Sequence, residues 1–134
     1  MTIINEQYQD ILLSIIRSAL LGETTTYEEI ALDVGNLPTR GNQLGQALTP
    51  PLLDILDWCI ANRIPYLTAL VVRKSGADQG LPGKRFWERL GLEHLSRQEK
   101  RVLTAEYQRQ VYDFFRVFGR QVLLEELHPT EDHS

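Results

Sequence analysis

The stretch that decides the predicted fold is Thr24-Thr25-Thr26-Tyr27-Glu28-Glu29-Ile30-Ala31, which opens the segment 24–85. Glu29 follows Thr26 by three residues, the spacing of a capping box, in which both side chains satisfy free backbone amides at a helix start. A short helix is therefore predicted to begin after Thr26. Beyond Gly35, residues 37–48 offer a turn and a second short helix.

The second short helix has a polar face and an apolar face. Leu44, Ala47 and Leu48 are expected to face inward, as is Leu32 on the preceding helix. The polar face holds side chains that can donate to and accept from base edges in a DNA major groove, where Gln pairs with adenine and Arg with guanine. These side chains are Arg40, Asn42, Gln43 and Gln46.

A β-prone apolar run follows at residues 66–74, and the next residues, 75–80, form a turn with two glycines. Such a pair indicates a strand followed by a wing. Residues 81–91 then look like the return of the wing into a short helix anchored by Phe86, Trp87 and Leu90. The predicted fold class is mainly α with a small β-hairpin: a winged helix-turn-helix with extra N- and C-terminal helices.

Three further helices complete the prediction. Apolar residues at steps of three and four draw one stripe along residues 5–21. Pro50-Pro51 is expected to end the second short helix and start an apolar one, residues 52–62, because proline is tolerated in a first turn but not in a helix interior. Ser96 and Glu99 form a second capping box that opens a long helix to about Phe118. Residues 1–127 are predicted to form one domain, with a flexible tail at 128–134.

Charge is distributed unevenly along the chain. The formal net charge is −4, which argues against a general nucleic-acid binder. Residues 40–89, however, hold seven basic and four acidic residues. The basic residues predicted to contact phosphates are Arg73, Lys74, Lys84 and Arg85. The alternative is that the charges of residues 40–89 form an ordinary solvated mixture without a binding function.

Other classes of function find little support in the residues. The one cysteine excludes an internal disulfide, no run is long enough to span a bilayer, and no signal peptide is evident, so a cytoplasmic protein without a membrane partner is predicted. Cys59 lies among apolar residues and is predicted to be a buried structural thiol. The three histidines lack the spacings of a metal site, and no cofactor-binding motif or catalytic constellation is present.

Residues from about Gly22 to His94 resemble the winged DNA-binding domain of alkylguanine-DNA alkyltransferases and the non-catalytic alkyltransferase-like proteins. Residues 22–31 look like that family's Thr-Tyr-Gly-Glu-Ile-Ala helix, and Leu44-Gly45-Gln46-Ala47-Leu48 looks like the end of its recognition helix. Val71-Val72 followed by Ser75-Gly76 matches its strand and wing.

The resemblance implies roles for individual residues. Tyr27 corresponds to the tyrosine that helps rotate the target nucleotide. The intercalating arginine falls at Asn42, or at Arg40 if the alignment is shifted. Thr68 stands where the reactive cysteine would be, with Ala69 in place of its histidine. Alkyl transfer is not expected, because a threonine without a base is a poor nucleophile.

These observations lead to one main function and one alternative. The main prediction is a non-catalytic protein that binds double-stranded DNA, either recognising a DNA structure or lesion or acting as a regulator. The alternative is a protein-interaction module, binding a partner protein or forming a homodimer through the 52–62 helix or the C-terminal helix. The net negative charge favours the alternative.

Overall fold

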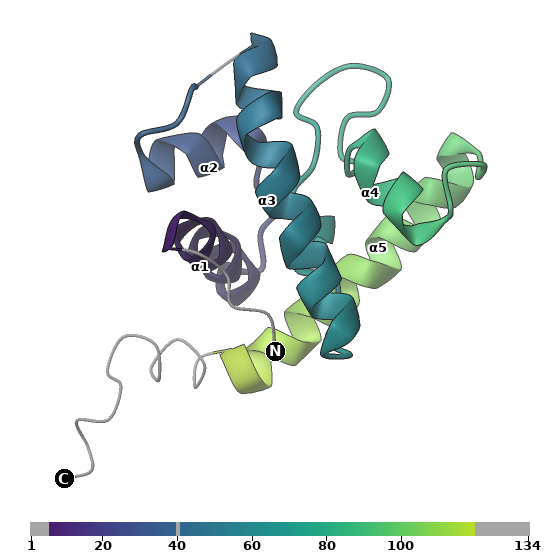
Figure 1. Ribbon diagram of the computed structural model, residues 1–134. Coiled ribbons are helices and arrows are strands. Elements are labelled where there is room, and N and C mark those ends of the chain that lie inside the picture. Colours follow the sequence, from purple (N-terminus) through teal and green to yellow (C-terminus); the bar gives the residue numbers. More distant parts are fainter. Residues whose placement is uncertain (1–5, 40, 120–134) are drawn as a thin grey trace, which may run out of the picture.

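The computed structural model describes residues 6–39 and 41–119, and within these ranges the chain is mainly helical (Figure 1). These residues form five α-helices, a short 3-10 helix between the third and the fourth, and a π-helical segment that extends the last. In chain order the elements are α1 (Glu6–Leu21), α2 (Tyr27–Val34), α3 (Gly41–Ala61), η1 (Leu67–Leu70), α4 (Lys84–Leu90), α5 (Arg97–Phe114) and η2 (Phe115–Gly119).

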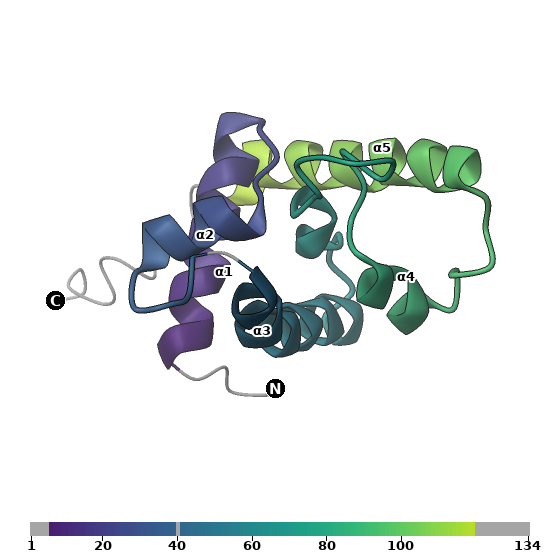
Figure 2. The same ribbon diagram turned by 90° about the horizontal axis from the view of Figure 1, so that it is seen from above.

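The long helix α3 crosses the middle of the molecule (Figure 1). Helices α1 and α2 lie on one side of it and α4 on the other. Seen from above, α5 runs along the opposite side of the molecule from α3, and η1 lies between these two helices (Figure 2). None of the helices in the described ranges is long and apolar enough to cross a membrane.

The termini of the predicted helices are confirmed where the sequence contains caps. The hydroxyl of Thr26 accepts a hydrogen bond from the Glu29 amide at 3.2 Å, which starts α2. Ser96 and Glu99 form both bonds of the capping box that opens α5. The stripe along α1 is also confirmed, because Ile11 and Ile15 are fully buried in the main core.

The predicted strand at residues 66–74 is wrong. Leu67–Leu70 instead forms the 3-10 helix η1, and all four of its residues are buried. Helices α1, α3 and α5 all pack against η1. A short unbroken apolar run suits a buried strand and a buried helical turn equally well, so periodicity alone could not distinguish them. A strand would also need a neighbouring strand for its backbone bonds, and none is present among the described residues.

The predicted β-hairpin, and with it the winged helix-turn-helix class, is also wrong. Between η1 and residue 119 the chain makes only two isolated bridges, Thr25 with Val71 and Arg73 with Gln79. The Arg73 amide donates to the Leu81 carbonyl at 3.0 Å, and the Gly80 amide donates to the Arg73 carbonyl at 2.9 Å. These two bonds close residues 73–81 as a loop, and we call this segment the 73–81 loop.

The two prolines do not divide α3, which contradicts the predicted break at residues 50–51. Prolines at these positions cannot donate to the carbonyls of Gln46 and Ala47. A continuous buried stripe spans the prolines, and burying each large apolar side chain contributes about 1.5–3 kcal/mol. The stripe consists of Leu44, Leu48, Leu52, Ile55 and Cys59. We attribute the continuity of α3 to this shared packing.

A smaller core fixes α4. Phe86 and Trp87 pack with Leu56 of α3 and Ala69 of η1. The indole N–H of Trp87 donates to the Pro82 carbonyl at 3.2 Å, which satisfies the polar atom of this buried ring. Helix α4 is therefore held against α3 at a defined position, as the sequence predicted for its aromatic residues.

Two predictions about apolar surface need correction, and one about the C-terminal tail falls on residues that the structure does not describe. Leu32, expected to face inward, is 74% exposed on α2. The predicted dimer helix, residues 52–62, turns most of its apolar residues into the core, which leaves less apolar surface for a partner. The predicted tail, 128–134, lies outside the described residues.

The cap of α2 gives a test of the fold. Thr26→Ala removes the hydroxyl that accepts from the Glu29 amide, and should lower the free energy of unfolding by about 0.5–2 kcal/mol. Urea unfolding followed by circular dichroism measures this change. Thr24→Ala, at an exposed position before the cap, is the matched control and should leave stability unchanged. Equal losses in both variants would contradict the assigned cap.

Candidate functional site

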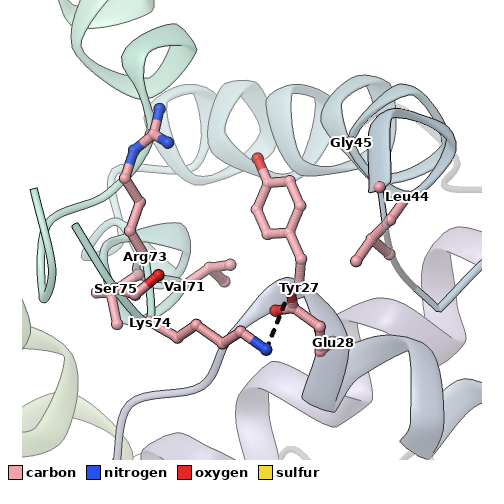
Figure 3. A pocket seen from close by; sticks show the side chains of 11 residues that line it. Tyr27, Glu28, Leu44, Gly45, Val71, Arg73, Lys74 and Ser75 are labelled. Carbon is pink, nitrogen blue, oxygen red and sulfur yellow. Dashed lines mark ion pairs between the residues drawn. The ribbon is translucent and has the colours of Figure 1, made fainter.

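A cavity of about 280 Å³ opens where α2, α3 and the 73–81 loop meet. We call it the Tyr27 pocket. In Figure 3 the ring of Tyr27 lies between Arg73 of the loop and Leu44 of α3. The pocket therefore joins three segments that are far apart in the sequence. Its lining residues are Tyr27, Glu28, Gly41, Leu44, Gly45, Val71, Val72, Arg73, Lys74, Ser75 and Gly83.

Two cations border this pocket, and their environments differ. The Lys74 ammonium lies 3.7 Å from the Glu28 carboxylate, with both side chains substantially exposed. Such surface pairs contribute only about 0–1 kcal/mol, so an external anion can compete for the lysine. Arg73 has no ion-pair partner among residues 6–39 and 41–119, although its charge helps to lower the pKa of Asp78.

The beginning of α3 forms another wall of the Tyr27 pocket. Gly41 and Gly45 line it without side chains, and a Cβ built on either would meet no atom within 4 Å. No acidic residue occupies the first turn of α3, so the positive end of the helix dipole is left uncompensated by that turn. The predicted DNA-contacting residue Arg40, directly before this turn, lies outside the described residues.

A second, wider hollow of about 740 Å³ lies between α3 and α4. We call it the α3–α4 groove. It shares Gly41 and Gly45 with the Tyr27 pocket, so the two hollows adjoin. Its lining residues are Gly41, Asn42, Gly45, Gln46, Thr49, Pro50, Leu53, Asp54, Arg85 and Arg89.

The structure thus brings together most of the residues singled out from the sequence. Tyr27, Arg73 and Lys74 line the Tyr27 pocket, and Asn42, Gln46 and Arg85 line the α3–α4 groove. Two others line neither hollow. These are Gln43, which is exposed, and Lys84, whose ammonium lies 3.7 Å from Glu88.

Thr68 lies in a small apolar cavity of about 30 Å³ beside the Tyr27 pocket. It is 5% exposed, and its buried hydroxyl has no hydrogen-bond partner among the described residues. Among the residues that the structure describes, Tyr27 and Arg85 are the only titratable ones that line this cavity. Neither is a carboxylate or an imidazole, so the cavity offers Thr68 no general base of the kind that activates hydroxyl nucleophiles.

Two residues that the sequence did not single out hold the 73–81 loop. Arg101 of α5 donates from Nη1 to the Gln79 carbonyl at 2.9 Å and from Nη2 to the Ala77 carbonyl at 3.0 Å. Nε of Arg97 donates to Asp78 at 2.9 Å, and this bond is the main reason that the pKa of Asp78 is lowered. Arg97 and Arg101 are four residues apart, which places them on one helix face. Their spacing does not indicate that this face contacts the 73–81 loop.

The described residues contain no group of three His, Cys, Asp or Glu side chains that could hold a metal ion. Cys59 is fully buried in the main core. Burial raises the pKa of its thiol to about 12, although a hydrogen bond with the backbone of Leu67 opposes this shift.

No protein-family model, no curated protein and no solved structure matches this chain. The resemblance to alkyltransferase-like proteins therefore stays a prediction. It depends on the motifs at residues 22–31 and 44–48, because no strand or wing forms at residues 71–76.

The environment of Cys59 predicts its reactivity. With a pKa of about 12, only about one thiol in ten thousand is ionised at pH 8, and the thiolate is the reactive form. We expect no reaction of the native protein with a chromogenic disulfide reagent within minutes at pH 8, followed by stoichiometric reaction in 6 M guanidinium, about the strength that unfolds even hyperstable domains. Rapid labelling of the folded chain would contradict the buried assignment.

Proposed function

We propose that this protein binds double-stranded DNA without acting on it, through the surface formed by the Tyr27 pocket and the α3–α4 groove. One observation carries the proposal: polar and cationic residues from α2, α3, the 73–81 loop and α4 line two adjoining hollows. The resemblance of residues 22–31 and 44–48 to alkyltransferase-like proteins is consistent with the same class of ligand, although the strand and wing of that family do not form at residues 71–76.

The Tyr27 pocket suits a phosphate of the DNA backbone. Arg73 supplies a guanidinium without an ion-pair partner among the described residues, and Lys74 supplies a weakly paired ammonium. The first turn of α3 adds backbone amides and the positive end of its dipole. Gly41 and Gly45 leave room for an anion to approach this turn.

The α3–α4 groove suits the reading of base edges. Asn42 and Gln46 both line it, and carboxamide side chains can bond an adenine edge through two hydrogen bonds. Arg85 lies on the opposite wall, where it also pairs with Glu88 at 3.8 Å. Phosphates in the Tyr27 pocket would fix the register of the duplex, and the carboxamides would contribute the sequence preference.

Acidic residues set the expected strength of binding. Glu28 lines the Tyr27 pocket and Asp54 lines the α3–α4 groove, while the whole chain carries a net charge of −4. Few phosphates can therefore be neutralised at once. We expect binding that is tight only at low salt.

The first test removes the unpaired cation. Arg73→Ala should weaken binding to all duplexes alike and reduce the slope of log K against log salt by about 1. Fluorescence anisotropy with a labelled duplex at several salt concentrations measures both effects.

Arg63→Ala is the matched control, because Arg63 is also an exposed arginine but lies beyond the far end of α3. That helix rises about 30 Å over its 21 residues. No binding by the parent protein at low salt would overturn the proposal. It would favour the protein-interaction alternative, which the exposure of Leu32 supports.

The second test asks how the target is chosen. If the α3–α4 groove reads sequence, Gln46→Ala should remove about 1–3 kcal/mol of discrimination between a selected duplex and a random one. Competition binding with duplexes selected by the parent protein measures this difference. Gln43→Ala, on the same helix but outside the groove, is the control. Unchanged discrimination in Gln46→Ala would overturn the role of Gln46 in reading base edges.

A further inference from the structure

The 73–81 loop has little packing of its own. Residues 73–77, 79 and 80 are exposed, and only Leu81 at its end is buried in the protein. Gly76 and Gly80 adopt positive φ values of 87° and 83°, a backbone region that other residues rarely adopt. The conformation of this loop must therefore depend on hydrogen bonds more than on apolar contacts.

Some of those bonds are internal to the loop. The Gln79 amide donates to Gly76 at 3.1 Å, and the Leu81 amide donates to Asp78 at 3.0 Å. The two bonds of the Arg73 backbone close the base of the loop. Backbone bonds in an exposed turn compete with water, so by themselves they leave such a loop free to open.

Besides the Lys74–Glu28 ion pair, helix α5 supplies contacts to the loop, and it supplies them from outside the proposed DNA-binding surface. The guanidinium of Arg101 binds the carbonyls of Ala77 and Gln79 with two separate nitrogens. A Cβ on Gly80 would lie 3.9 Å from Nη1 of Arg101, so the guanidinium lies directly against the loop backbone. Arg97 binds the side chain of Asp78, the residue between Ala77 and Gln79 in the sequence. In Figure 2 the loop lies alongside α5.

We propose that Arg97 and Arg101 are positioning residues: they hold the 73–81 loop so that Arg73 and Lys74 face the Tyr27 pocket, and they raise its affinity for phosphate without touching the ligand. The inference rests on the proposed function for the identity of the ligand. It assigns to α5 a role in binding even though α5 lines neither hollow.

The fork geometry of the guanidinium, as distinct from its charge, separates this role from a direct contact with DNA. Only a planar guanidinium can bind two carbonyls through a fixed fork, whereas a lysine keeps the charge and loses the fork. Arg101→Lys should therefore behave as a loss if Arg101 positions the loop, and as nearly neutral if it attracts phosphate. The same change at Arg109, which pairs with Glu106 and Asp113 further along α5, is the matched control.

The first readout needs no ligand. Hydrogen exchange, followed by nuclear magnetic resonance, should show faster exchange of the Gly80 and Arg73 amides in Arg101→Lys and in Arg97→Lys. The expected acceleration is about tenfold for the loss of one charge-assisted hydrogen bond. Amides in α1 should be unaffected, and Arg109→Lys should match the parent. Unchanged exchange of the Gly80 amide in both loop variants would overturn the proposal.

The second readout is binding of a labelled duplex at low salt. Arg101→Lys should weaken binding several-fold in the parent and have no further effect once Arg73 and Lys74 are both alanine. An equal loss in both backgrounds would overturn the positioning role. Faster loop exchange in a protein that does not bind DNA would support the loop contacts and overturn the proposed ligand, so the two failures can be told apart.

Discussion

Packing against the buried 3-10 helix η1 is the constraint on which the rest of the structure depends. Its four residues are all buried, and α1, α3 and α5 each contact it. Because η1 leads directly into Val71 and Arg73, the same core position that joins these helices also fixes where the 73–81 loop leaves the core. The Thr25 backbone binds Leu70 at 2.8 Å and Val72 at 2.9 Å, which places the start of α2 beside the same point. The packing of the core around η1 thus also positions the segments that line the Tyr27 pocket.

The continuity of α3 has a consequence for the candidate binding surface. Its C-terminal half is buried in the core through Ile55 and Cys59. Its N-terminal turns border both hollows through Gly41 and Gly45, and Asn42 and Gln46 of these turns line the α3–α4 groove. A single rigid helix therefore connects the packed core to the proposed recognition surface. Two separate helices, as Pro50-Pro51 had suggested, would leave the first of them with only Leu44 and Leu48 to hold it. A site built on a well-packed helix keeps its geometry better than a site on a loop.

The cationic part of the surface depends on weaker forces. Arg73 and Lys74 belong to an exposed loop whose position depends on polar contacts with α5. Water competes for each of these bonds, so the loop can adjust more readily than the helix can. The proposed site therefore combines a rigid wall, which suits the reading of base edges, with a more adaptable one, which suits contacts to the uniform phosphate backbone.

The sequence by itself determined the features that depend on near neighbours: the Thr26 cap, the capping box at Ser96, the apolar stripe of α1 and the burial of Cys59. These features follow from residue spacing and local composition, both of which can be read directly from the sequence. Only the tertiary structure decided that residues 67–70 are helical, that α3 continues through its prolines, and that α5 holds the loop. Each of these depends on free energy from residues far away in the chain, which can outweigh a local preference of about 1–3 kcal/mol.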